Sequence, residues 1–278
     1  MSTRMIERPV VQRAEQKAKQ GSGWYAVLAR TGLVAKGVSF AIVGALALKL
    51  ALGDGGSATS RQGALQQLAG TTLGKALLIP LALGFAAYAI WRFVQAIAEK
   101  PGRDDGAAKA WAKRAAYVGR GLIYAGLTYS TVKILLGAGG SQSQSGKAHK
   151  TTAVVLSWPA GTWLVGIAGV VIIGVALWNL YRGVSRKFED KWRGPSKWGS
   201  RAGLVGHCAR FVVFGLIGWF VIKAAVEYDP KQSIGLDGAL QKLAHATYGS
   251  VLLGVTAAGL VAYAVYCFVD ARLRDVSV

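Results

Sequence analysis

Six long apolar stretches dominate this chain and separate its charged segments. They cover residues 33–52, 73–97, 117–136, 152–181, 208–226 and 251–269. A hydrocarbon core about 30 Å thick is crossed by roughly 20 apolar residues of α-helix, and every stretch is close to that length or longer. The sequence therefore predicts an all-α, polytopic membrane protein with six transmembrane helices.

The charged residues have an unusual distribution. Only 17% of the residues are charged, against roughly 25% in a soluble domain, yet the net charge is +20. A basic face on a soluble fold would favour nucleic-acid binding, but here the basic residues lie between the apolar stretches. No nucleic-acid partner is therefore expected. The expected partners are membrane lipids, including anionic headgroups on the cytoplasmic side, with a membrane protein as a further candidate.

The basic residues also predict an orientation. Of the 33 Lys and Arg residues, 24 lie in the N-terminal segment, the second and fourth connections and the C-terminal tail. Because the connections are short, the positive-inside rule places both termini in the cytoplasm, in a bacterial cell (inner) membrane. A cleaved secretory signal ending near Ala47 is the alternative for the first stretch. That stretch and its basic lead are longer than in typical signal peptides, which favours a retained helix.

Three tandem copies of one two-helix unit follow a basic tail, residues 1–23. The units cover residues 24–100, 110–193 and 196–275. In each unit a basic residue at the start of the first helix precedes a lysine by 13 residues, giving the pairs Lys36 and Lys49, Arg120 and Lys133, and Arg210 and Lys223. The motif GALxxLA follows in the first and third units, at residues 63–69 and 238–244. The second helices end in related patterns: Gly84, Tyr88, Trp91, Arg92; Gly174, Trp178, Tyr181, Arg182; Gly259, Tyr263, Tyr266, Cys267.

These motifs resemble a bacterial multi-pass membrane protein family catalogued as domain of unknown function 1206. The resemblance covers nearly the whole chain from Trp24, although the middle unit has residues 141–146 in place of the GALxxLA motif. It implies the six-helix, three-unit architecture and carries no assigned activity. Since each unit crosses the membrane twice, the copies share one orientation, and a pseudo-threefold arrangement about an axis along the membrane normal is a hypothesis.

Lys49, Lys133 and Lys223 are the main candidate site residues. Each lies about 20 Å along its helix from its basic partner, at 1.5 Å per residue, which places the ammonium groups near the outer interface. In one interpretation the lysines reach independently into the lipid headgroups. In the other they face a shared axis, where they bind an anion or headgroup and repel cations.

Three other groups of residues have structural interpretations. The GALxxLA segments are amphipathic and are expected to lie along the outer surface as interfacial helices. A metal or redox site from His207, Cys208, Cys267 and Asp270 is disfavoured, because the other units lack the cysteines and buried cysteine usually behaves as a small hydrophobe. The expected cytoplasmic-interface anchors are Trp91, Arg92, Tyr181, Arg182 and Tyr266.

No catalytic motif, carboxylate pair or metal-ligand pattern occurs in the chain. Neither enzyme activity nor a cofactor is therefore expected. Ionisable groups are scarce within the apolar stretches, which argues against ion-coupled transport. The favoured function is a structural, or partner- or lipid-binding, membrane component. A small anion or lipid channel or transporter that uses the outer lysines is the alternative.

Overall fold

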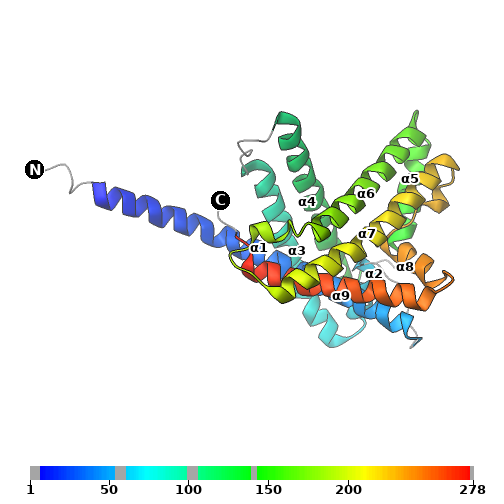
Figure 1. Ribbon diagram of the computed structural model, residues 1–278, viewed down its shortest axis with the longest axis horizontal. Coiled ribbons are helices and arrows are strands. Elements are labelled where there is room, and N and C mark those ends of the chain that lie inside the picture. Colours follow the sequence, from blue (N-terminus) through cyan, green and yellow to red (C-terminus); the bar gives the residue numbers. More distant parts are fainter. Residues whose placement is uncertain (1–6, 54–60, 99–105, 139–142, 276–278) are drawn as a thin grey trace, which may run out of the picture.

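The regular elements of this protein are helices (Figure 1). The computed structural model describes residues 7–53, 61–98, 106–138 and 143–275. Six long helices lie in these ranges: α1 (Glu7–Ala51), α3 (Thr72–Ala98), α4 (Ala107–Leu135), α6 (Gly161–Val184), α7 (Lys197–Val226) and α9 (Gly249–Leu273). The shorter ones are α2 (Arg61–Ala69), α5 (Gln144–Leu156), α8 (Leu236–Ala244) and the 3-10 turns η1 (Glu189–Lys191) and η2 (Pro230–Gln232).

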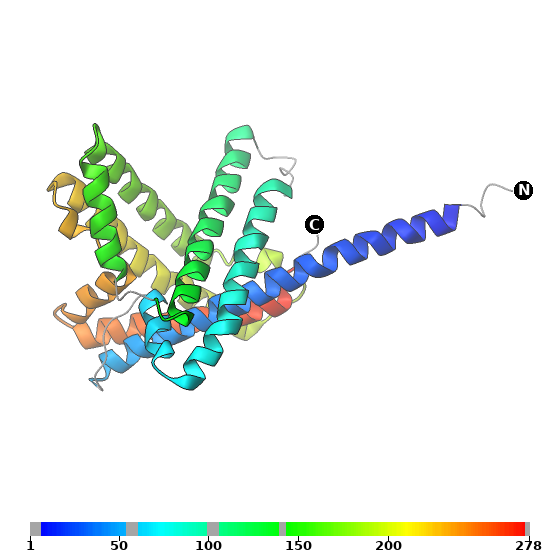
Figure 2. The same cartoon turned by 180° about the vertical axis from the view of Figure 1, so that it is seen from behind.

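The long helices form three antiparallel pairs, α1 with α9, α3 with α4 and α6 with α7 (Figure 1, Figure 2). Each pair joins helices from different sequence units. Within the first unit α1 also packs on α3, and within the third unit α7 packs on α9. Over the described residues α4 and α6 form no comparable interface, and they diverge in both views. The two long helices of the middle unit are therefore separated, whereas those of the first and third units pack on each other.

Within the described residues, five helices are long and apolar enough to cross a membrane, which suggests a membrane protein. They are Gly23–Ala51 within α1, and α3, α6, α7 and α9. Helix α4, which covers the expected third span, is not among the five. Its sequence contains Arg120, Lys133 and several hydroxyl-bearing side chains, which lower its mean hydropathy. Most of α6 is exposed apolar surface, as expected of a helix that faces lipid.

The first helix of each unit begins ten or more residues before the expected span. The expected spans start at residues 33, 117 and 208, whereas α1, α4 and α7 start at Glu7, Ala107 and Lys197. Helix α1 thus runs through most of the expected N-terminal tail, of which residues 1–6 lie outside the described part. The expected spans begin two or three residues before a basic residue, but helical hydrogen bonding extends much further toward the N-terminus. Lys36, Arg120 and Arg210 consequently lie inside helices and not at their starts.

The expected span over residues 152–181 is two helices. Helix α5 ends at Leu156, and α6 begins at Gly161 after a turn in which Ala160 is left-handed, with φ +61°. Pro159 lies in this turn, and proline ends a helix because its ring removes a backbone donor and clashes with the preceding turn. Helix α5 is therefore the middle unit's counterpart of α2 and α8, although the GALxxLA motif is missing.

The same turn geometry joins the short helix to the second long helix in all three units. The turn brings a glycine against a carbonyl oxygen of the short helix, so that an added Cβ would overlap that oxygen. The three pairs are Gly74 with Leu68, Gly161 with Val155 and Gly249 with Ala244. Only glycine allows this close approach of two backbones. The turn is thus a structural signature of the unit that the motif alone did not reveal.

Helix α8 packs into the protein on one side and exposes Gln241 and Lys242 on the other, so its expected place along the outer surface stays a prediction. Ala239 and Leu240 have no exposed surface, and α8 packs against α5, α7 and α9. The backbone N–H and hydroxyl of Ser145, at the start of α5, donate to the Asp237 carboxylate of α8 at 3.1 and 2.9 Å. This polar contact fixes the short helices of the second and third units against each other.

Candidate functional site

Two equivalent basic residues meet at one tyrosine in the interior. Lys36 of α1 donates from Nζ to the Tyr263 hydroxyl at 2.7 Å, and Arg210 of α7 donates from Nη1 to the same oxygen at 2.6 Å. Both cations also lie over the Tyr263 ring, at 4.9 and 4.6 Å from its centroid. Tyr263 is buried on α9. Two positively charged side chains thus share one hydroxyl acceptor.

Residues of the first and middle units form a second part of this arrangement. The rings of Tyr88 and Tyr124 lie 4.3 Å apart, and Lys36 Nζ is 6.0 Å from the Tyr88 centroid. Arg61 of α2 donates from Nη1 to the Tyr124 hydroxyl at 3.2 Å. The Arg61 guanidinium also lies 5.1 Å from the ring of Phe40, which itself packs on Tyr263. The short helix therefore contributes a third cation to the interior.

The fourth cation is Arg120 of α4, the middle unit's equivalent of Lys36 and Arg210. It is half-buried and interacts electrostatically with Arg92, Arg182 and Arg210. Over the described residues it makes no hydrogen bond or ion pair. We refer to the resulting set as the cation–tyrosine cluster, and its members are Lys36, Arg61, Arg120, Arg210, Tyr88, Tyr124 and Tyr263.

The cluster carries positive charge that no described carboxylate neutralises. The ion pairs in the described ranges are Arg193 with Asp275, Lys223 with Glu227, and Arg274 with Asp270. Buried Nε atoms of Arg92 and Arg210 have no hydrogen-bond partner. Burying unpaired charge is costly, and cation–π contacts offset only part of that cost. Guanidinium and ammonium groups match the oxygens of phosphate, sulfate or carboxylate, so the cluster is suited to bind an anion.

The outer lysines predicted as an anion site lie elsewhere. Lys49 and Lys133 are exposed, and Lys133 Nζ lies 5.2 Å from the ring of Tyr129. Lys223 lies 3.6 Å from the carboxylate of Glu227, one turn away on the surface. Among the described contacts, no hydrogen bond or ion pair joins the three lysines. A shared anion site at these lysines stays a prediction.

The predicted interface anchors divide into buried and exposed residues. Trp91, Arg92 and Tyr266 are buried, whereas Tyr181 is 45% exposed and Arg182 is half-buried. An anchor must reach the headgroup layer. The three buried side chains therefore pack inside the protein and do not contact headgroups. Arg92 donates from Nη2 to the Tyr88 hydroxyl at 2.6 Å and lies 4.1 Å from the Trp91 ring.

The histidine, cysteine and acidic residues near the ends of α7 and α9 have separate contacts. His207 stacks on Phe188 with 5.2 Å between centroids. The Asp270 carboxylate accepts from Arg274 and from Trp192 Nε1, at 2.8 and 3.0 Å. Cys208 and Cys267 are free thiols. The described part of the chain contains no group of three His, Cys, Asp or Glu residues that could hold a metal ion.

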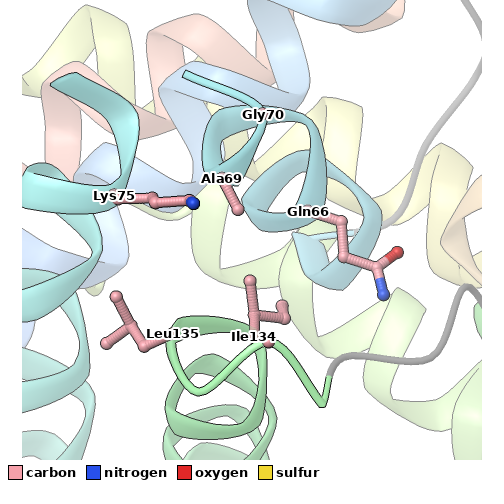
Figure 3. Close-up of a pocket in the computed structure, with 7 residues that line it drawn as sticks. Gln66, Ala69, Gly70, Lys75, Ile134 and Leu135 are labelled. Carbon is pink, nitrogen blue, oxygen red and sulfur yellow. The ribbon is translucent and has the colours of Figure 1, made fainter. Parts of the chain in front are cut away.

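A shallow pocket of about 420 Å³ lies where α2, the start of α3 and the end of α4 meet (Figure 3). Figure 3 shows the Lys75 side chain extending toward Ala69, with Ile134 and Leu135 on the opposite wall. The remaining lining residues are Gln66, Gly70 and Gly137. This pocket has one lysine and a mostly apolar lining, so it matches an anion less well than the cation–tyrosine cluster does.

Three segments of the chain match one protein-family model. Residues 31–99, 115–186 and 205–274 each match the family described as Domain of Unknown Function (DUF1206). The chain belongs to this family. The resemblance inferred from the repeated motifs is thereby confirmed, and this DUF1206 protein contains three tandem copies of the family unit.

The DUF1206 protein is also similar to a curated bacterial protein. The uncharacterized protein YxxB of Bacillus subtilis (strain 168) is 31% identical to it over 251 residues, which cover 87% of this chain and 89% of the relative. No solved structure matches the chain. The comparisons therefore establish the family and the repeat, and the site rests on the geometry of the cation–tyrosine cluster.

Proposed function

We propose that this DUF1206 protein is an integral component of a bacterial cell membrane that binds an anionic group at the cation–tyrosine cluster. The carrying observation is that three cations, Lys36, Arg61 and Arg210, donate to tyrosine hydroxyls without a described carboxylate among them. A fourth cation from the remaining unit, Arg120, lies near enough to Arg210 to repel it. Ionisable groups inside a membrane protein are costly and mark functional sites. This proposal narrows the favoured structural, or partner- or lipid-binding, function to anion binding, at a site in the helix interior and not at the outer lysines of the alternative function.

The proposal includes six membrane crossings, with α4 as the sixth. Helix α4 pairs with α3 along its length, as α9 pairs with α1 and α7 with α6, so its polar residues have a protein partner within the bilayer. The repeated pairing supports a pseudo-threefold arrangement of the units. The excess of basic residues in the N-terminal segment and the second and fourth connections supports cytoplasmic termini.

Anion binding can be tested on one helix with a matched pair of substitutions. Arg120 belongs to the cluster and Lys133 is exposed on the same helix, and neither is held by a hydrogen bond or ion pair in the described part of the chain. In detergent, inorganic phosphate at about 100 times its dissociation constant should stabilise the parent by about 2.7 kcal/mol. That gain corresponds to roughly 5 to 10 °C in Tm.

Arg120→Gln should lose most of the phosphate-induced rise in Tm, because one of the converging cations is removed. Lys133→Gln should keep it. Chloride at equal ionic strength is the control for general screening. An equal phosphate effect in Arg120→Gln and the parent, or no effect in the parent, would contradict the proposed function.

A further inference from the structure

The units differ in how their two long helices meet. In the first unit a methyl group added at Gly32 of α1 would lie 2.5 Å from Tyr88 Cβ on α3, and one added at Gly84 would overlap Ala35. In the third unit the equivalent Gly206 would meet Tyr263 Cα at 2.5 Å, and Gly259 would overlap Ala209. Two glycines and one alanine thus let the helix backbones touch. We call this contact the glycine seam.

The same register in the middle unit gives Ala116, Gly119, Gly174 and Trp178. Alanine replaces the glycine that faces the aromatic residue, and tryptophan replaces tyrosine. An added Cβ would meet nothing within 4 Å at Gly119 or at Gly174. Ala116 is exposed and Trp178 is 53% exposed. Helices α4 and α6 therefore do not form the glycine seam, and Ala116 and Trp178 are bulkier than the glycine and tyrosine at their positions in the other units.

The open seam borders the cation–tyrosine cluster at Arg120. Arg120 follows Gly119 on α4, and Arg182 lies one turn beyond Trp178 on α6. These two arginines interact electrostatically with each other, and Arg120 also with Arg210. Apolar side chains such as Ile123 of α4 and Val170 of α6 are exposed on the same two helices. The opening thus combines an apolar wall with a positive inner end.

We infer that an anionic phospholipid occupies the open seam, with its phosphate at the cation–tyrosine cluster and an acyl chain between α4 and α6. This inference rests on the proposed function and names the class of ligand. A free anion would satisfy the cations but leave the apolar helix faces uncovered. An apolar helix of a second copy would cover those faces but leave the cations unneutralised. A phospholipid satisfies both surfaces, because its headgroup is anionic and its tail apolar.

The seam can be closed by giving the middle unit the residues of the other two. The variant Ala116→Gly, Gly119→Ala, Trp178→Tyr restores that pattern and leaves every cation in place. The full chain is equilibrated with mixed micelles of equal phosphatidylglycerol and phosphatidylcholine, and retained lipid is counted by native mass spectrometry. Gly119→Phe is a second variant, which fills the opening where the structure has space and should fold normally.

The parent should retain phosphatidylglycerol over phosphatidylcholine by about fivefold or more, as expected for about 1 kcal/mol per well-placed cation. Both seam variants should lose that preference and keep the phosphate-induced rise in Tm. Equal retention of the two lipids by the parent, or parent-like retention by the seam variants, would overturn the inference. So would a parent dimer that dissociates when the seam is closed, because a second copy would then be the occupant. If phosphate does not raise the Tm of the parent, that separate result would contradict the proposed function.

Discussion

Gly259→Leu should destabilise the protein by about 3 kcal/mol or more, whereas Gly174→Leu should change its stability little. Both glycines occupy the same register in the second helix of their unit. A side chain at Gly259 would overlap Ala209 and push α9 away from α7, and overpacking of this kind typically costs about 1 to 3 kcal/mol or more. At Gly174 nothing lies within 4 Å. Leucine also favours a helix over glycine by roughly 1 kcal/mol in water.

Thermal unfolding of the two variants in the same detergent measures this difference directly. Gly84→Leu in the first unit is the matching positive control, because an added Cβ there would overlap Ala35. The three variants together test whether one unit of three is open. If Gly174→Leu lowers Tm as far as Gly259→Leu does, then α4 and α6 are in contact and the open seam is refuted.

Asp270→Ala should cost about 3 to 5 kcal/mol, because it leaves a buried arginine without its partner. Asp270 is 1% exposed and Arg274 is 6% exposed, with 2.8 Å between their charged atoms. Burial on its own would lower the pKa of Arg274, but the Asp270 carboxylate outweighs it and holds that pKa above its usual range. A raised pKa in an arginine gives stability that is fully present at every pH below the pKa of the unfolded state, which lies well above pH 9. The loss of unfolding free energy in Asp270→Ala should therefore be the same from about pH 6 to pH 9.

Asp275→Ala is the matched control for Asp270→Ala. Asp275 pairs with Arg193 at 2.9 Å on the same C-terminal segment, but both side chains are about half exposed. Exposed pairs contribute about 0 to 1 kcal/mol, so this variant should unfold close to the parent temperature. Equal destabilisation by the two substitutions would show that the C-terminal segment, and not the buried ion pair, accounts for the effect.

The repeat motifs predicted the family and the three units because they are set by local chemistry. The length of an apolar stretch shows whether its helix can cross a membrane, and five of the six expected spans correspond to described helices that are long and apolar enough. The break at Pro159 and Ala160 was missed because the apolar run continues on both sides of it. The short helix α5 was missed for a related reason, since its sequence lacks the motif while the Gly161 turn keeps the geometry.

The cation–tyrosine cluster could have been found only in part. Lys36, Arg120 and Arg210 were aligned by the repeat, but the apolar spans begin only two or three residues before them, which placed these residues at helix starts. Their meeting with Tyr263 and Tyr124 depends on contacts between units, which no local pattern contains. Arg61 could not be assigned, because α2 was expected on the outer surface. The outer lysines remain a prediction, and their exposed positions are compatible with independent contacts to headgroups.

The most direct test of the account is a density map of the full-length protein in a nanodisc that contains phosphatidylglycerol. We expect a phosphate-sized density within hydrogen-bond distance of Lys36, Arg120 and Arg210, and continuous acyl-chain density between α4 and α6. An empty cation–tyrosine cluster, with α4 packed against α6 through Gly119 and Gly174, would contradict it.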